Sequence, residues 1–336
     1  MKRYIFLIMV LLFLLEGCSI TNNNDSSIPA STDISNPFEQ GTEDNIRYEY
    51  SLGLVSAEPS IENSEDELKI LYKGNPIKLT VGVESIEGDF EIGILVLLNG
   101  IPQDYILDNN KTSMSKLNLK TKENKDLQIS FTPNTGEKGE TLSFQILGIF
   151  NPSYLPKGDE RKQIIGFNDN YIQCIPFKLE MHEDIENRKT TVNYNYKSVA
   201  FNDEILLKYK KASSAAAQTS LLVDNTFFLI SESNAEEITS LKSNNGVIKT
   251  RLELLGGVET DYIISVFQDN KIVNCFDGKP FARIKNKKGC TNIIDIEFNS
   301  LSKDTSRLYA IAVPIDKDFN VVFNSSVEKS QSVVID

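Results

Sequence analysis

Short apolar runs in which polar and apolar residues alternate constrain the fold of this chain more than any other feature. The runs are rich in Ile, Val, Phe, Tyr and Thr, and clusters of Gly, Asn, Asp and Pro separate them. A period of two is typical of strands that bury one face, and pairs such as Asn99-Gly100 and Asn245-Gly246 tolerate the positive φ of tight turns. Because long amphipathic helical stretches do not separate the runs, the pattern predicts an all-β protein. The clearest strands are expected at 77–83, 90–98, 127–131, 142–150, 261–268, 293–298 and 308–314.

The strand pattern occurs twice along the chain. The segment that begins at Ile77 aligns with the segment that begins at Ile248, and the offset stays near 170 residues further along. We therefore expect two copies of one β domain. The other aligned positions are Phe90 with Tyr262, Phe131 with Phe298, and, more roughly, 142–149 with 308–315.

The length of the repeat indicates what each copy folds into. It exceeds the roughly 20 to 50 residues of a solenoid unit, and several strands per copy are typical of a β-sandwich. The predicted fold therefore resembles two tandem immunoglobulin-like β-sandwich domains, although the Cys, Trp and Cys signature of true immunoglobulin domains is missing because the chain has no Trp. We expect domain 1 at 46–183, a charged linker at 184–189 and domain 2 at 190–336. Within domain 2, the Ala, Lys and Leu content of 206–218 favours a short helix or an ordered insert.

Residues 1–18 have the layout of an export signal. Lys2 and Arg3 precede an apolar run at 4–15, and Glu16-Gly17-Cys18 follows. Twelve apolar residues extend only about 18 Å as a helix, too short for a hydrocarbon core of about 30 Å, so a secretory signal peptide is favoured over a membrane span. With Leu15, Gly17 and Cys18 at the positions of a lipobox, the leader resembles that of a bacterial lipoprotein, although Glu16 departs from the small or apolar residue usual in that family. An ordinary signal, cleaved or uncleaved, is the alternative.

The lipoprotein resemblance implies where the mature protein is held. It implies cleavage before Cys18 and a thioether-linked diacylglycerol on that residue, and two acyl chains hold a protein stably on a membrane. Residues 18–45 are rich in Asn, Ser, Thr and Asp and are expected to form a disordered tether. The use of Asn, Lys and Ile resembles Gram-positive proteins of AT-rich genomes, in which the anchor would be the outer face of the cell membrane. In a Gram-negative cell, Ser19 after the lipidated Cys would resemble an outer-membrane destination.

The net charge limits the classes of partner, and the cysteine content limits the possible disulfides. The net charge of −12 argues against binding to nucleic acid or to anionic lipid. An exported chain can form disulfides, and a Cys275–Cys290 bridge would close a loop of about fifteen residues, worth on the order of 3 kcal/mol. The alternative is that Cys275 and Cys290 stay unpaired and pack as small hydrophobic residues. We expect Cys174 to pack within a strand rather than to act as a nucleophile.

Few residue sets in the chain are suited to catalysis. The only histidine is His182, in the charged boundary between the copies, so a serine or cysteine hydrolase would have to use a residue that we expect to be solvated. Glycosidases need only two carboxylates about 5–10 Å apart, but the two acidic groups of interest are expected to be polar turns between strands. No catalytic residue is therefore predicted. The acidic groups are Glu84, Glu87 and Asp89 in the first copy, and Glu259 and Asp261 in the second.

Three Asn- and Asp-rich loops and one aromatic loop remain as binding candidates. Oxygen-rich loops of extracellular β domains can hold Ca²⁺, but none of the three has EF-hand spacing, and Asx turns explain them. No cofactor is predicted, with structural Ca²⁺ as the alternative. The loop 150–158 carries two aromatic residues and two prolines, which suit either a partner contact or a cover over the end of the core. The three oxygen-rich loops are Asp108-Asn109-Asn110, Asn168-Asp169-Asn170 and Asp269-Asn270.

Together these features predict a lipid-anchored, extracytoplasmic protein that is a non-enzymatic binding or scaffolding module of the cell envelope. Its partner would be an envelope protein or a glycan. One alternative is a solute-binding lipoprotein of a transporter, which requires two lobes of alternating strands and helices. The other is a carboxylate-based glycoside hydrolase of the cell wall, which requires a deep cleft with paired acids.

Overall fold

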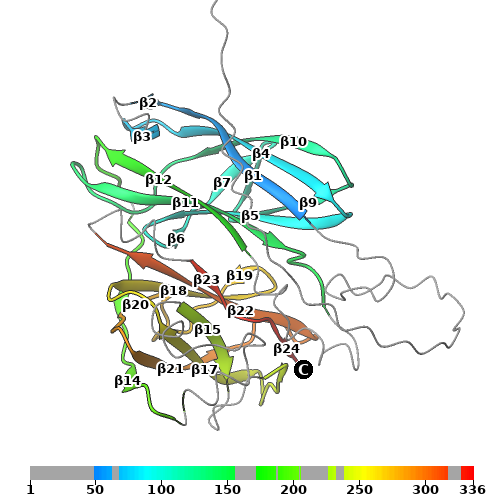
Figure 1. Ribbon diagram of the computed structural model, residues 1–336, viewed down its shortest axis with the longest axis vertical. Coiled ribbons are helices and arrows are strands. Elements are labelled where there is room, and N and C mark those ends of the chain that lie inside the picture. Colours follow the sequence, from blue (N-terminus) through cyan, green and yellow to red (C-terminus); the bar gives the residue numbers. More distant parts are fainter. Residues whose placement is uncertain are drawn as a thin grey trace, which may run out of the picture. The chain divides into compact units, whose positions relative to one another are not determined.

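The computed structural model describes residues 49–62, 68–155, 172–186, 188–203, 205, 226–231, 238–316 and 327–336. Cys18, the tether at 18–45 and the helix or insert expected at 206–218 lie outside these residues. The elements are strands arranged in four sheets (Figure 1), which confirms the all-β prediction. The described residues belong to one compact unit. In the described part of the chain, helices of the length and apolarity needed to cross a bilayer do not occur.

The N-terminal strands form two sheets that enclose one apolar core. Alternate residues of β4, such as Leu79 and Val81, point into this core and meet Phe90 and Ile92 of β5. Sheet A has the order β1 (Glu49–Glu58), β4 (Ile77–Glu87), β10 (Asn124–Phe131), β7 (Tyr105–Leu107) and β8 (Asn110–Thr112). Sheet B has the order β2 (Ser60–Glu62), β3 (Leu68–Tyr72), β12 (Ile172–Met181), β11 (Thr141–Phe150), β5 (Phe90–Leu98) and β6 (Ile101–Pro102), and β9 (Met114–Leu119) also pairs with β5.

The C-terminal strands form a second pair of sheets around a second core. Leu252 and Leu254 of β17 contribute to it from one sheet, and Ile264 and Val266 of β18 contribute from the other. Sheet D has the order β14 (Lys197–Ala200), β21 (Cys290–Asn299), β17 (Val247–Gly256) and β15 (Thr226–Ser231). Sheet C has the order β13 (Val192–Asn193), β20 (Phe281–Lys285), β18 (Asp261–Gln268), β22 (Ser306–Ile315), β24 (Val333–Ile335) and β16 (Ser240–Leu241), and β19 (Lys271–Ile272) and β23 (Glu328–Lys329) flank β18 and β22.

The two pairs of sheets repeat one strand arrangement. In the first pair Ile77 lies opposite Phe131, and in the second Ile248 lies opposite Phe298. Residues that align in the sequence therefore occupy equivalent positions in the strand pairing. The short strand β3 pairs in parallel with β12, and in the second pair of sheets the short strand β16 pairs in parallel with β24. Strand β12 lies next to β11, and β24 lies next to β22. The internal repeat is thus visible in the pairing.

The last aligned segment needs a correction. Gly148 lies opposite Ile94, and Ala310 lies opposite Val266. The sequence alignment placed Gly148 on Pro314, four residues further along, because apolar runs of similar composition align almost equally well at shifts that keep the same face buried.

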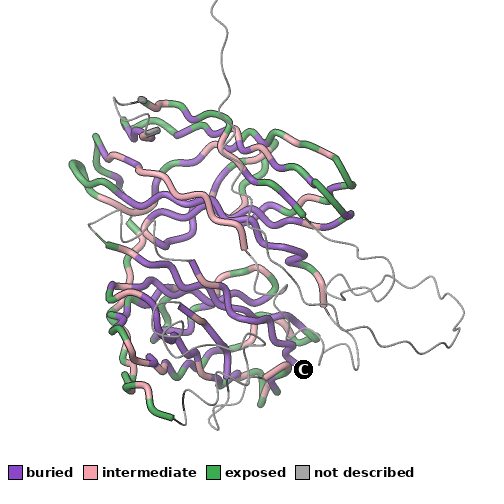
Figure 2. The backbone as a smooth tube through the Cα atoms, in the orientation of Figure 1, coloured by how far each residue is buried: buried purple, intermediate pink, exposed green. Residues whose placement is uncertain are grey.

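Sheets B and C also contact each other. Leu95 and Leu147, on the side of sheet B that faces away from its own core, pack with Phe267 and Tyr309 of sheet C. The Phe267 and Tyr309 rings stack with centroids 5.2 Å apart. Strands β5, β11, β18 and β22 are consequently buried on both faces, which Figure 2 shows as continuous purple tubes.

The strands of the two pairs of sheets fall on either side of the charged segment 184–189. Strands β1 to β12 lie within 46–183 and strands β13 to β24 lie within 190–336. The charged boundary packs against the N-terminal sheets: Ile185 is buried in their core, and Lys189 N donates to Asn134 O at 2.7 Å. These contacts hold the described part of the segment 184–189 against sheets A and B.

Candidate functional site: a groove beside an open strand edge

The acidic turns singled out from the sequence form structural contacts. The Asp89 carboxylate accepts hydrogen bonds from Lys120 Nζ and Thr121 N, each at 2.8 Å. The bond from Lys120 and then the backbone bond from Thr121 hold the pKa of Asp89 below its usual range. In the second copy, Asp261 accepts from Arg283 Nε at 2.8 Å. Each acid therefore ties its turn to a neighbouring strand or turn.

Of the two alternatives left open for Cys275 and Cys290, the structure has the unpaired one, because both thiols are free. Cys275 is buried in the core between sheets C and D, whereas Cys290 begins β21 and lies opposite Ala200 of β14. Cys174 lies in β12 and packs against the apolar cluster between sheets B and C, as expected of a strand residue. Burial raises the pKa of the Cys174 thiol to about 12.

The other candidates from the sequence are also explained by local structure. His182 follows β12, with its side chain 48% exposed and Nε2 3.6 Å from Glu180 Oε2. Two of the oxygen-rich loops are turns with paired positive φ values, at Asp108 and Asn109 and at Asp269 and Asn270, and residues 168–170 lie outside the described part. Among the described residues, no group of three or more His, Cys, Asp or Glu side chains is placed to hold a metal ion.

The described part of the aromatic loop packs on the core, where Phe150 is buried and Tyr154 is partly buried. Phe150 is buried with Tyr50, to which it stacks at 6.5 Å between centroids. Arg307 Nη1 donates to Asn151 O at 2.6 Å and so connects this loop to β22. Residues 156–158 of the loop lie outside the described part.

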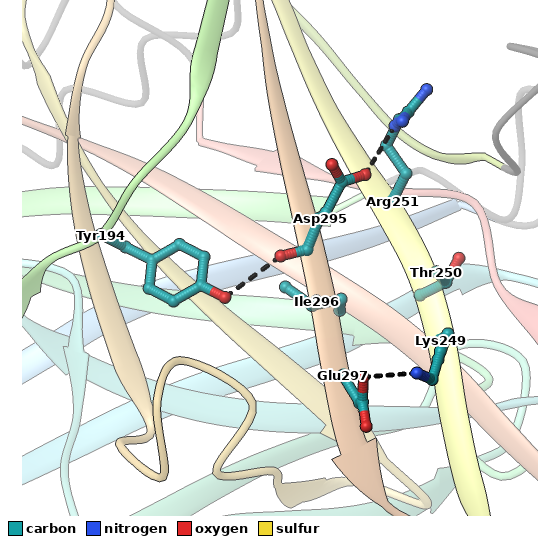
Figure 3. A pocket seen from close by; sticks show the side chains of 7 residues that line it. All are labelled: Tyr194, Lys249, Thr250, Arg251, Asp295, Ile296 and Glu297. Carbon is teal, nitrogen blue, oxygen red and sulfur yellow. Dashed lines mark hydrogen bonds and ion pairs between the residues drawn. The ribbon is translucent and has the colours of Figure 1, made fainter.

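A surface hollow of about 510 Å³ lies beside β21. Tyr194 lies on one side of it, and β17 and β21 supply the rest of the wall (Figure 3). Two ion pairs cross these strands: Arg251 Nε to Asp295 Oδ1 at 2.9 Å and Lys249 Nζ to Glu297 Oε2 at 2.8 Å. The remaining lining residues are Thr250 and Ile296.

In the described part of the chain, β21 has a strand partner along only part of the edge beside this groove. Strand β14 pairs with β21 from Cys290 to Ile293 and ends there. Among the described residues, no strand pairs with the rest of β21 on this side. Asp295 O accepts from Tyr194 Oη at 3.1 Å on the open side. Backbone groups on one side of a strand recur every second residue, so the N–H and C=O groups of Glu297 and Asn299 also point outward.

The first copy fills the equivalent position with a strand of its own. There β7 pairs with β10, and Ile106 lies opposite Ser130, the residue equivalent to Glu297. In the second copy the corresponding turn pairs Phe276 only with Lys279. Phe276 is fully buried and contacts the Tyr194 ring edge-on, with centroids 5.3 Å apart. Counted over the described residues, sheet A therefore has five strands and sheet D has four.

Tyr194 fills part of the space that the missing strand leaves. Burial is the larger cause that raises the pKa of Tyr194 above its usual range, and the nearby carboxylate of Asp277 raises it further. The hydroxyl therefore stays protonated at neutral pH and donates to the Asp295 carbonyl. A single side-chain bond thus satisfies one of the backbone groups on the open edge.

The sequence did not single out this groove. Asp295 and Glu297 are the polar positions of an ordinary alternating strand at 293–298, and nothing in that alternation distinguishes an open edge from a paired one. A comparison of the two copies offers the relevant signal: within the described ranges, the apolar β7 residues Tyr105, Ile106 and Leu107 have no counterpart that pairs with this part of β21.

Comparisons with known proteins assign no family. No family model matches the chain, and no curated protein is significantly similar to it. Similar solved structures include a protein of unknown function from Porphyromonas gingivalis W83, with 11% identity, TM-score 0.19, and coverage of 79% of this chain and 95% of that one. Others are CBD12 from CALX1.2, with 8% identity, TM-score 0.20 and coverage of 80% and 95%, and red sea bream transglutaminase, with 6% identity, TM-score 0.20 and coverage of 86% and 31%. At these scores the likenesses say nothing about function.

Proposed function

We propose that the protein is a lipid-anchored, non-enzymatic binding module of the bacterial cell envelope. The observation that carries the location is the leader, in which a positive start, a short apolar run and Gly17-Cys18 follow one another. Diacylglycerol on Cys18 would hold the chain at the membrane surface, and the polar stretch at 18–45 would separate it from the lipid. The binding role is supported by the groove beside β21, where a regular sheet is left incomplete.

The alternatives fit the described residues less well. A solute-binding lipoprotein needs alternating strands and helices in two lobes, whereas the described elements are strands. A glycosidase needs two carboxyl groups that are free to approach a sugar. One is protonated and acts as the acid, and the other is ionised and acts as a base or a nucleophile. The acids in the groove, Asp295 and Glu297, form ion pairs with Arg251 and Lys249.

Lipid attachment is tested by metabolic labelling of expressing cells with an alkyne-bearing fatty acid. We expect label on the full-length protein and none on Cys18→Ser, which should be released from the membrane fraction. Cys174→Ser is the matched control, because its thiol is partly buried and packs against the cluster between sheets B and C, and it should keep the label. Label on Cys18→Ser, or an unlabelled and freely secreted parent protein, would contradict the anchor.

The non-enzymatic part of the proposal is tested separately. The purified full-length protein in detergent is incubated with peptidoglycan and with glycan and peptide substrates, and soluble products are measured. We expect no turnover above that of a heat-denatured sample. Turnover that disappears when Asp295 or Glu297 is changed to Asn or Gln would show that the groove is an active site and would overturn the proposal.

A further inference from the structure

We propose that the open edge of β21 at Asp295–Asn299 accepts an extended strand of a partner protein in which Lys or Arg alternates with apolar residues. The inference rests on the binding role proposed above and specifies which residue types the partner's strand should carry. Its starting point is backbone geometry, because an unpaired strand edge presents a row of N–H and C=O groups that another extended chain can pair with. At this edge the outward groups belong to Asp295, Glu297 and Asn299.

The first copy of the repeat shows what such a strand would look like. There β7 occupies the equivalent position, with Tyr105 buried in the core, Leu107 packed against it and Ile106 pointing outward, 48% exposed. Alternate residues of an added strand would therefore face the margin of the core, formed in the second copy by Tyr194 and Phe276. Apolar residues suit these inward positions, because they remove the exposed parts of that margin from water.

Charge determines which residues suit the outward-facing positions of the added strand. The side chains of Asp295 and Glu297 point outward on β21 and are 76% and 58% exposed. Residues directly opposite on an added strand would lie close to these carboxylates, and opposite charges are favoured in such cross-strand pairs. Each carboxylate has two oxygens, so an incoming Lys or Arg can bind beside Lys249 or Arg251. The net charge of −12 favours approach by a cationic segment.

The same acids disfavour a second copy of this chain as the occupant. If two β21 edges paired with each other, Asp295 or Glu297 of one molecule would lie opposite an acid of the other in the central registers. Like charges directly opposite each other destabilise a sheet. Charged side chains on an edge strand are a recognised protection against self-association. The partner is therefore a different polypeptide.

Binding is measured with the full-length protein in detergent micelles and a fluorescein-labelled peptide of about seven residues in which lysine and valine alternate. Fluorescence anisotropy gives the Kd. We expect saturable binding that weakens at least tenfold for Glu297→Pro, because proline has no N–H and cannot donate to the added strand. Glu297→Gln is the matched variant that keeps this donor, and it should weaken binding only about threefold.

Two altered peptides separate strand pairing from general attraction to a negatively charged protein. One has the same sequence with alternate backbone nitrogens methylated, which keeps the charge and removes the donors, and it should lose at least tenfold in affinity. The other replaces lysine with glutamate and should not bind. The methylated peptide also serves if Glu297→Pro does not fold, since it is tested on the native protein.

Three results would overturn the inference. They are equal affinity for the methylated and unmethylated peptides, equal affinity of a folded Glu297→Pro and the parent protein, and failure of the lysine–valine peptide to bind at millimolar concentration. Fatty-acid labelling of Cys18 does not depend on this edge. A failure here with successful labelling leaves the anchor standing, whereas loss of labelling with preserved peptide binding removes only the anchor.

Discussion

Proline substitution at two equivalent positions tests whether the edges of β10 and β21 differ as described. Ser130 lies opposite Ile106 of β7, and its N–H points to that strand, whereas the equivalent N–H of Glu297 points into the groove. Ser130→Pro removes the N–H that bonds to β7 and leaves an acceptor of β7 without a donor. Glu297→Pro removes a donor that has no strand partner among the described residues.

The size of each effect follows from these contacts. A lost backbone hydrogen bond together with an unsatisfied acceptor costs about 1–3 kcal/mol, so we expect Ser130→Pro to lower the free energy of unfolding by that amount. Glu297→Pro loses only an exposed ion pair with Lys249, and such pairs contribute about 0–1 kcal/mol. Proline is tolerated on a strand edge whose N–H faces solvent. We therefore expect a change within about 1 kcal/mol for Glu297→Pro.

Urea unfolding followed by circular dichroism measures both values. Ser130→Ala and Glu297→Gln are the controls, since each removes the side-chain group and keeps the backbone N–H. Equal destabilisation by the two prolines, or a larger effect of Glu297→Pro, would show that the β21 edge is already paired and would refute the reasoning.

Two further predictions concern the contact between the sheets and the buried thiol. A Cβ on Gly100 would lie 2.7 Å from Ile263 Cβ, so Gly100→Ala should cost about 2–4 kcal/mol by urea unfolding, from overpacking and positive φ together. Gly246→Ala, at a similar φ of 79° but in open space, should cost only about 1 kcal/mol, and equal costs would contradict the contact between sheets B and C. Burial raises the pKa of Cys174 from 9.0 to about 12, so its neutral thiol stabilises the fold fully below pH 9 and progressively less as the pH rises towards 12. Ellman's reagent at pH 8 should therefore modify Cys174 only after unfolding in urea, and rapid modification of that thiol in the native protein would contradict its burial.

The alternating runs were sufficient to predict seven of the longer strands, each of which lies within an observed strand. Ile77 and Phe131 point into one core, and Ile248 and Phe298 point into another. Alternation with a period of two records which face of a strand is buried, and the same faces are buried in both copies. The fold class could therefore be read from local sequence.

The contact between sheets B and C had a sequence signal that differs from alternation. Strand β5 ends in Ile94-Leu95-Val96-Leu97-Leu98, a continuous apolar run, and such runs are typical of strands covered on both faces. The run shows that a second layer exists but not which segment supplies it. That identity depends on the tertiary contact with Phe267 and Tyr309, which lie far away in the sequence.

The groove could not be predicted because it depends on a strand that is missing from a pairing. Ser130 and Glu297 occupy equivalent polar positions of alternating strands, and each lies opposite a residue of the central strand, β4 or β17. On the other edge, among the described residues, only Ser130 lies opposite a further strand. The state of Cys275 and Cys290 could not be decided from the sequence for a related reason. The two residues are close in sequence, but Cys275 follows β19 and is buried in the core, whereas Cys290 begins β21. Sequence separation does not fix the direction of either side chain.

Hydrogen–deuterium exchange of the full-length protein in detergent tests the open edge most directly. Peptide fragments that cover Asp295–Asn299 are compared with fragments that cover the equivalent part of β10, with and without the lysine–valine peptide. We expect the outward amides of β21 to exchange faster than those of β10 in the free protein, and to gain protection when the peptide is added. Equal protection of the two strands in the free protein, or no gain at Asp295–Asn299 at saturating peptide, would contradict the account.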